Sequence, residues 1–201
     1  MRTVGIIAEY NPFHTGHEYH IRKARELSGA DYVIVVMSPD FVQRGEPAVF
    51  DKYTRTRMAL QGGANLVIEL PVCYATGSAE YFAEGATALL DSLGTVNTLC
   101  FGGESDDISL FQNIADILIQ EPKEYTDLLR SFLKQGMTYP QARCQALSHY
   151  LKNQISDPSS SALLPDQCKL PDLETVTDFL STPNNILGIE YCKALKKLEV
   201  P

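Results

Sequence analysis

The feature that most constrains the fold is the alternation of short apolar runs with helical patterns over the first half of the chain. The runs are TVGIIA at 3–8, DYVIVVMS at 31–38, NLVIELP at 65–71 and NTLCFGG at 97–103. Short runs without polar alternation are typical of strands covered on both faces of a parallel sheet. With helices between them, they predict an α/β fold with a doubly wound parallel sheet, whose ligands bind at the carboxyl ends of the strands.

The segments between these runs carry helix signals. The first helix is expected from about Gly16 to Ser28, with Ile21, Ala24 and Leu27 near one apolar face and Gly29 as its stop. Two more helices are predicted over about 51–61 and 78–94. We therefore assign residues 1–120 to an α/β core.

Residues 121–201 are predicted to form a helical region. It contains a Ser/Pro-rich loop at about 153–173 and a last helix, which is expected to return to the active site. Thr182 is a natural N-cap for this helix, and Pro183 fits the first helical position. Its predicted apolar stripe is Leu187, Tyr191, Ala194 and Leu198.

Composition sets the broad class. The net charge of -8 argues against a non-specific nucleic-acid binder, although residues 1–60 by themselves carry a balance of +1. The five cysteines form no CxxC pair and read as reduced thiols, with no metal site. No run is long enough to span a membrane and no signal peptide is present, so we expect a soluble cytoplasmic protein.

A histidine-rich stretch, EYNPFHTGHEYH at 9–20, follows the first apolar run directly. It is predicted to lie where the first strand ends and the first helix begins. Backbone N–H groups are unpaired at a helix start and the helix dipole is positive there, so such a turn attracts phosphate. Gly16 lets phosphate approach the backbone, and the imidazoles of His14 and His17 can donate hydrogen bonds to a leaving pyrophosphate.

The alternative is that His14 and His17 only cap a turn. Their HxGH spacing, at the first strand-to-helix junction of an α/β pattern, favours nucleotide binding instead. His20 falls on the face of Ala24 and Leu27, so we expect it to be a satisfied, half-buried residue. The stretch contains neither GxGxxG nor GxxxxGK[ST], and the dinucleotide-binding and P-loop interpretations therefore lack support.

The stretch NPFHTGH resembles the HxGH signature of the nucleotidyltransferase superfamily, whose members bind ATP at this turn. Longer strings together resemble the bacterial tRNA(Met) cytidine acetate ligase family: GIIAEYNPFHTGHEYHI, VIVVMSPDFVQRGEPAVFDKYTRTRMAL, NLVIELPVCYA, FGGES and TPNNILGIEYCKAL. This resemblance implies a Rossmann-like nucleotidyltransferase fold. It also implies an ATP-dependent ligase that adenylates acetate and acetylates N4 of the wobble cytidine of elongator tRNA(Met), with Mg²⁺ and ATP as cofactors.

Carried over by position, the resemblance makes His14 and His17 the catalytic residues. The stretch that would wrap ATP is Ile7, Ala8, Glu9, Tyr10, Asn11, Pro12, Phe13, His14, Thr15, Gly16, His17, Glu18, Tyr19 and His20. Gly102 would let the nucleotide pack against backbone at the end of the fourth strand. Asn184 or Asn185 would also bind the nucleotide, with Asn184 slightly preferred and helix capping as the alternative for both.

Basic residues after the second strand are candidates for substrate or tRNA contact. Arg44 is predicted to bind acetate or the α-phosphate, because its planar fork suits bidentate contact with either. Lys52 and Arg55, three apart on a helix, are predicted to meet tRNA phosphates, whereas Arg57 is expected on a solvated face.

Two further hypotheses stay open. One is an adenylyltransferase acting on a small phosphorylated metabolite, and the other is an RNA-binding module without catalysis. Family members continue well past the position where this chain ends, at Pro201. The family's C-terminal tRNA-binding domain is therefore expected to be absent, and the chain to be a fragment or a naturally short relative.

Overall fold

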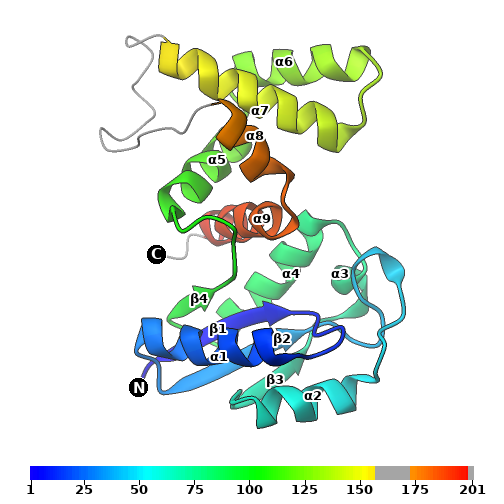
Figure 1. Ribbon diagram of the computed structural model, residues 1–201, viewed down its shortest axis with the longest axis vertical. Helices are drawn as coiled ribbons and strands as arrows, with labels where there is room; N and C mark the ends of the chain where they lie inside the picture. Colours follow the sequence, from blue (N-terminus) through cyan, green and yellow to red (C-terminus); the bar gives the residue numbers. More distant parts are fainter. Residues whose placement is uncertain (157–172, 199–201) are drawn as a thin grey trace. The chain divides into compact units, whose positions relative to one another are not determined.

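The structure, a computed structural model, describes residues 1–156 and 173–198 (Figure 1). It contains two compact units, and each is described by itself. The first unit comprises Met1–Gly102 together with the end of α9 (Pro183–Lys197) from Ala194, and the second comprises Gly103–Lys193. The division falls earlier than the predicted boundary at residue 120, since α5 (Ile108–Gln120) groups with the helices that follow it.

The first unit is built on a four-stranded parallel sheet, as predicted. Its strands are β1 (Thr3–Ala8), β2 (Tyr32–Met37), β3 (Leu66–Glu69) and β4 (Thr98–Cys100), in the order β3-β2-β1-β4. β1 pairs with β2 over its whole length, from Thr3 opposite Tyr32 to Ala8 opposite Met37. The two central strands are the most buried, which explains why their sequences are rich in β-branched residues and show no polar alternation.

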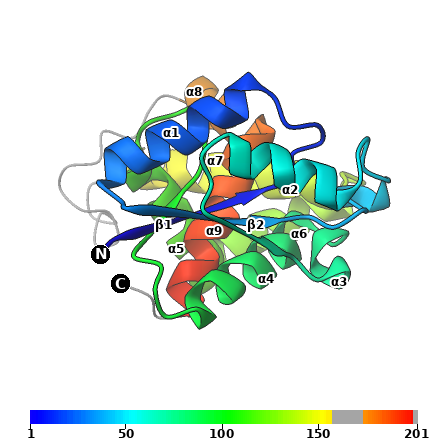
Figure 2. The ribbon, with the colours of Figure 1, turned by 90° about the horizontal axis from the view of Figure 1, so that it is seen from below.

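Helices cover both faces of this sheet (Figure 2). On one face, α1 (Thr15–Ser28) packs Ile21 and Ala24 into a core with Val4, Ile6 and the inward side chains of β2, and α2 (Lys52–Gln61) lies beside it. On the other face lies α4 (Ala79–Ser92), whose Leu90 would be 2.9 Å from a Cβ at Gly5.

Two local predictions need adjusting. Leu27, predicted on the apolar face of the first helix, is 80% exposed. Its position on the helix lies beyond the edge of the face that Ile21 and Ala24 bury against the sheet. A single-turn helix, α3 (Val72–Ala75), precedes α4 and was not predicted. The predicted stop at Gly29 is confirmed, since this residue is left-handed and its N–H caps α1.

The path of the chain creates a switch point in the sheet. β1, β2 and β3 follow one another outward with α1 and α2 on one face, and the chain then returns along α4 on the other face to place β4 beside β1. Adjacent strands with connections to opposite faces leave a crevice at their carboxyl ends, where open α/β sheets bind ligands. The turn after β1 lies at this edge.

The second unit is helical, as predicted. It contains α5, α6 (Lys123–Lys134), α7 (Tyr139–Ser156) and α8 (Leu173–Ser181), followed by most of α9. α6 and α7 pack as an antiparallel pair through Tyr125 and Tyr150, whose ring centroids lie 6.4 Å apart. α8 was not predicted. The predicted Ser/Pro-rich loop lies outside the described residues, except that its first residues continue α7 to Ser156.

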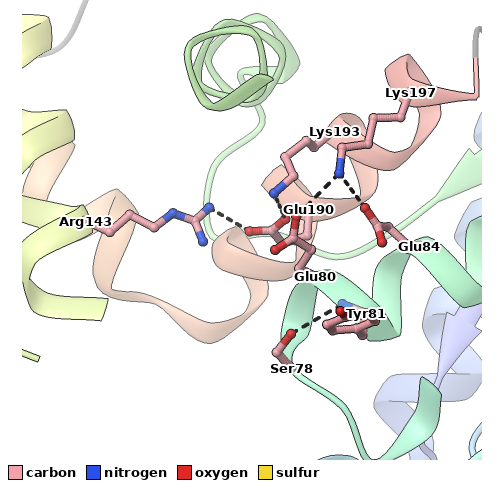
Figure 3. A network of polar contacts seen from close by, with 8 residues as sticks. All are labelled: Ser78, Glu80, Tyr81, Glu84, Arg143, Glu190, Lys193 and Lys197. Carbon is pink, nitrogen blue, oxygen red and sulfur yellow. Dashed lines mark hydrogen bonds and ion pairs between the residues drawn. The ribbon is translucent and has the colours of Figure 1, made fainter. Parts of the chain in front are cut away.

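Charged side chains on α9 are paired within each unit (Figure 3). In the second unit, Glu190 is 1% exposed and lies between Arg143 Nη2 at 2.6 Å and Lys193 Nζ at 2.9 Å. In the first unit, Lys197 points to Glu84 at 2.5 Å and Glu80 at 3.5 Å on α4.

The apolar residues of α9 follow the prediction only in part. Of the predicted stripe, Tyr191 and Ala194 are buried and Leu187 is half-buried, while Leu198 follows the helix end and is 39% exposed. Across both units, none of the helices in the described ranges is long and apolar enough to cross a membrane.

Candidate active site

The HxGH turn is a helix cap built from its own histidines. His14 is the N-cap residue of α1, and its Nδ1 accepts a hydrogen bond from the backbone N–H of Gly16 at 3.1 Å. In return, Nδ1 of His17 accepts from the backbone N–H of His14 at 3.3 Å. This is the reciprocal geometry of a capping box, with histidines in the two positions that Ser/Thr and Glu/Gln usually occupy.

The cap fixes the chemistry of both rings. Because each Nδ1 accepts a backbone N–H, a neutral ring carries its proton on Nε2 and can donate only from there. The two rings stack with centroids 3.8 Å apart. Burial lowers the pKa of His17 to about 4, with smaller contributions from the neighbouring charges of His14 and His20. His17 is therefore neutral at physiological pH.

Gly16 is required by the same cap. A Cβ at this position would lie 2.9 Å from His14 Cε1 and 3.0 Å from its Nδ1, so any side chain would displace the ring. Gly16 and His14 are both exposed, so an anion can approach this end of α1. The N–H of Gly16 already donates to His14 Nδ1, and those of His17 and Glu18 donate to His14 O, so the helix dipole and the Nε2 atoms are what the turn offers an anion.

The aromatic rings of Tyr10 and Phe13 pack against the ring of His17 in the turn. Tyr10, at φ 51°, is 1% exposed, and its ring contacts Phe13 at 4.9 Å and His17 at 4.8 Å between centroids. Burial raises the pKa of Tyr10, and its hydroxyl has no hydrogen-bond partner among the described residues. The Tyr10 side chain is covered, so only its backbone is left to face a nucleotide.

His20 and Gly102 lie near the end of β4. His20 is half-buried with Nε2 3.6 Å from Cys100 Sγ, which confirms that it is a satisfied residue. Gly102 follows β4, and a Cβ built on it would meet nothing within 4 Å. Because Cys100 pairs with Ile6, Gly102 and the HxGH turn leave the sheet from adjacent strands at the same edge.

The loop after β2, residues 39–50, is tied to the segment after β1. Glu9 Oε1 accepts from Gln43 N at 2.8 Å, and Asn11 Oδ1 accepts from Val49 N at 2.7 Å. At the loop's tip, Arg44 lies in a 3-10 turn with φ 69°, a left-handed conformation that is strained for arginine. Its side chain is exposed and has no partner within the described ranges, so its guanidinium is available to an anion.

The prediction that Arg55 meets tRNA phosphates is wrong. Arg55 is 0% exposed, and its guanidinium donates to backbone carbonyls of Phe50, Glu9, Ser38 and Pro39. Helical spacing placed Lys52 and Arg55 together but could not tell which of them points inward. Lys52 points outward and binds both carboxylate oxygens of Glu69, at 2.7 and 2.9 Å, so contact with a phosphate would compete with this pair.

Asn184 and Asn185 lie in the second unit, at the start of α9. Asn185 is 1% exposed, and its side chain accepts from Glu104 N at 2.9 Å and donates to Phe179 O at 3.2 Å. Asn184 is exposed and donates to the Glu104 carboxylate at 2.9 Å. Both amides therefore hold the turn at residues 103–104, and the exposed Asn184 is the one still open to a ligand.

Residues 1–156 and 173–198 contain no group of three or more His, Cys, Asp or Glu side chains that is arranged to hold a metal ion. Mg²⁺ commonly binds proteins through one or two carboxylates together with substrate phosphates, a mode that needs no such group.

The chain is similar to known proteins. Residues 1–201 match the model of the family described as HIGH Nucleotidyl Transferase. The chain is 47% identical to a tRNA(Met) cytidine acetate ligase of Clostridium perfringens, covering 99% of this chain and 46% of that protein. It is 45% identical to the protein of the same name from Acetivibrio thermocellus, covering 99% of this chain and 43% of that protein.

Solved structures agree as well. The crystal structure of Thermotoga maritima TmcAL bound with alpha-thio ATP matches with a TM-score of 0.87 and 43% identity, over 99% of this chain and 44% of that one. An apo form of the same protein matches with the same TM-score. The chain thus spans less than half the length of the relatives it matches.

Proposed function

Because the chain belongs to the HIGH nucleotidyl transferase family, we propose that it uses ATP to activate acetate for acetylation of N4 of the wobble cytidine of elongator tRNA(Met). The observation that carries the proposal is the match to Thermotoga maritima TmcAL bound with alpha-thio ATP, at 43% identity over 99% of this chain. The names of the relatives supply the acceptor, tRNA(Met) cytidine, and the donor, acetate. The cytoplasm, where tRNA is found, is the proposed location.

In the first step, a carboxylate oxygen of acetate attacks the α-phosphorus of ATP. The bond from this phosphorus to the oxygen bridging to the β-phosphate breaks, and pyrophosphate leaves with that electron pair. His14 and His17 serve this step as hydrogen-bond donors, because each can present Nε2–H to phosphate oxygens that gain charge. Mg²⁺, entering with ATP, neutralises part of the triphosphate charge.

The first turn of α1 holds the phosphates in place. The positive end of the helix dipole favours an anion next to His14 and Gly16. Arg44 is proposed to bind the acetate carboxylate or the α-phosphate, since its planar guanidinium suits either and is unpaired in the described chain. Gly102 leaves room for the nucleotide at the end of β4.

In the second step, the N4 amine of cytidine attacks the acetyl carbonyl carbon of acetyl-adenylate. The bond from this carbon to the phosphate oxygen breaks, AMP leaves, and the nitrogen loses a proton. Asn184 is proposed to contribute to nucleotide binding. Lys52 is proposed to meet the RNA only where a phosphate displaces it from Glu69.

Acetate-dependent exchange of labelled pyrophosphate into ATP tests the first step. We expect exchange that requires acetate, and a loss of about 100-fold or more in His14→Ala or His17→Ala, the size expected when one charge-stabilising donor is removed. The matched control is His149→Ala, an exposed histidine on α7 that contacts Phe132, which should leave exchange unchanged.

Two results would contradict the proposal. Full exchange in both histidine variants would remove the roles given to His14 and His17. Exchange that ignores acetate and requires a phosphate monoester would replace the ligase by an adenylyltransferase acting on a phosphorylated metabolite.

A further inference from the structure

Arg55 is a fully buried arginine whose bonds are all to backbone. Its Nε donates to Phe50 O at 2.9 Å, Nη1 donates to Glu9 O at 2.6 Å and Ser38 O at 3.0 Å, and Nη2 donates to Pro39 O. Burial of a charged group is costly unless its hydrogen bonds are made. Here carbonyl oxygens satisfy the guanidinium without a direct carboxylate partner in the described chain.

The positions of these carbonyls connect Arg55 to the candidate active site. Glu9 follows the last residue of β1, and Ser38 and Pro39 follow the last residue of β2. The parallel ladder between these strands ends at Ala8 and Met37, with one further bond from Ser38 N to Ala8 O. Arg55 therefore joins the segments after β1 and β2 just beyond the last hydrogen bonds between the two strands.

Each joined segment carries a part of the proposed site. The segment after β1 passes through the left-handed Tyr10 to the HxGH cap. The segment after β2 carries Arg44 at its tip. The side chains of Glu9 and Asn11 also link the two, but each by one bond to a backbone N–H group, part-buried for Glu9 and exposed for Asn11. Arg55 is the link that is charged, buried and multiply bonded.

We propose that Arg55 is a positioning residue for adenylation, which fixes the segments after β1 and β2 so that the histidine pair and Arg44 face one ATP molecule. This inference rests on the proposed function. The planar guanidinium suits the task because its donors point in fixed directions to several acceptors, whereas the lysine ammonium is a single point of charge. A displacement of about 1 Å in such groups is enough to cost on the order of 100-fold in rate.

The test compares three variants in the acetate-dependent exchange assay. Arg55→Ala is expected to lose about 100-fold in kcat, with a smaller change in the KM for ATP, and millimolar guanidinium is expected to restore part of the rate by filling the vacated site. Arg55→Lys keeps the buried stem and the charge but is expected to stay impaired. Arg57→Ala, exposed two residues further along α2, is the matched control and should behave as the original protein.

Backbone amide hydrogen exchange supplies a readout that does not depend on activity. In the Arg55 variants, amides of residues 9–14 and 38–50 should exchange faster, while the ladder amides of β1 and β2 keep their protection. If the original protein shows no acetate-dependent exchange, the proposed function fails, and the amide pattern still decides whether Arg55 holds these segments.

Two results would show that Arg55 is not a positioning residue. A folded Arg55→Ala or Arg55→Lys protein with unchanged kcat would show that the link is not needed for positioning. If Arg55→Ala does not fold, Arg55→Lys becomes the deciding variant. Protection lost evenly across the ladder and both segments would assign Arg55 to general stability instead.

Discussion

At the scale of single residues, the candidate site is defined by how its histidines are hydrogen-bonded. Both Nδ1 atoms are used by the cap of α1, so the two rings differ from free histidines in having only Nε2 to offer a ligand. A histidine cation would attract a phosphate more strongly than a neutral ring. Protonation of Nδ1, however, would remove the acceptor on which the hydrogen bonds of the cap depend. The local structure therefore favours neutral donors in this turn.

The titration of His17 gives a prediction about pH. Its folded pKa is about 4 and its unfolded pKa is about 6.5, so below pH 6.5 the unfolded chain binds a proton that the folded chain does not. The stability that His17 contributes is complete above pH 6.5 and is lost as the pH falls towards 4. Between pH 7 and pH 5 this amounts to roughly 1–2 kcal/mol of unfolding free energy.

The control for this measurement is His17→Gln, because glutamine at the same helical position can keep the capping box without titrating. Urea unfolding at several pH values between 5 and 7 should show a steeper pH dependence for the original protein than for His17→Gln. Parallel curves for the two proteins would mean that His17 titrates normally in the folded state.

Arg44 gives a second prediction at this scale, since its backbone is strained. A left-handed conformation costs a non-glycine residue about 1–2 kcal/mol, and glycine gives back about 0.5–1 kcal/mol of this through backbone entropy. Arg44→Gly should therefore raise the unfolding free energy by roughly 0.5–1 kcal/mol. Arg44→Ala keeps the strain and should show no such gain.

Both Arg44 variants are expected to lose acetate-dependent exchange, because both lack the guanidinium. Strain kept at a position where it costs stability is typical of functional sites. An Arg44→Gly protein that is more stable and fully active would show that the strained arginine serves no purpose in the reaction.

At the scale of elements, the sequence predicted the strands and most helices in their order along the chain, because their apolar periodicities differ. The runs of β1 and β2 are continuous and β-branched, which only a doubly covered strand explains. α3 and α8 were missed. α3 is a single turn of four residues, too short for a helical period to be read from it.

The missed side-chain roles have a physical reason. Arg55 satisfies its donors with carbonyls from Glu9, Ser38 and Pro39, and backbone acceptors leave no signature in a sequence. The same holds for Asn185, whose buried amide bonds to the backbone of Glu104 and Phe179. The HxGH pair was found because its spacing coincides with a helix start, a local feature that sequence does report.

The end of β4 offers a prediction that separates folding from binding. A Cβ at Gly102 would meet nothing within 4 Å, so Gly102→Ala should leave thermal stability unchanged. If the nucleotide packs against this backbone, the same methyl group should lower ATP affinity by about tenfold or more, measured by equilibrium titration with ATP and Mg²⁺.

Gly85→Ala is the matched opposite case. A Cβ there would lie 2.3 Å from Tyr74 Cγ, so this variant should lose roughly 1–3 kcal/mol of stability through overpacking. At temperatures where it remains folded, its ATP affinity should be normal. Unchanged ATP affinity in Gly102→Ala would move the nucleotide away from the end of β4.

At the scale of the whole molecule, charge limits how RNA can be held. The net charge is -8, and the unpaired basic residue identified near the site is Arg44, whereas Lys52 is bound to Glu69 and Arg55 is buried. Few phosphate contacts imply a weak dependence of RNA binding on salt. Among the hypotheses, an RNA-binding module without catalysis is therefore the least supported by the charge distribution.

ATP binding should be visible in the stability of the molecule. A ligand that binds only the folded state, present at about 100 times its Kd, stabilises that state by about 2.7 kcal/mol. For a chain of about this size each kcal/mol raises the Tm by roughly 2–4 °C, so saturating ATP with Mg²⁺ should raise the Tm by about 5–10 °C if the two units unfold together. His14→Ala should lose this shift, and His149→Ala should keep it.

A Tm shift without acetate-dependent pyrophosphate exchange would indicate a protein that binds the nucleotide but does not adenylate acetate. Binding of ATP alone accounts for the added stability, whereas only the exchange reports that the bond at the α-phosphorus is broken.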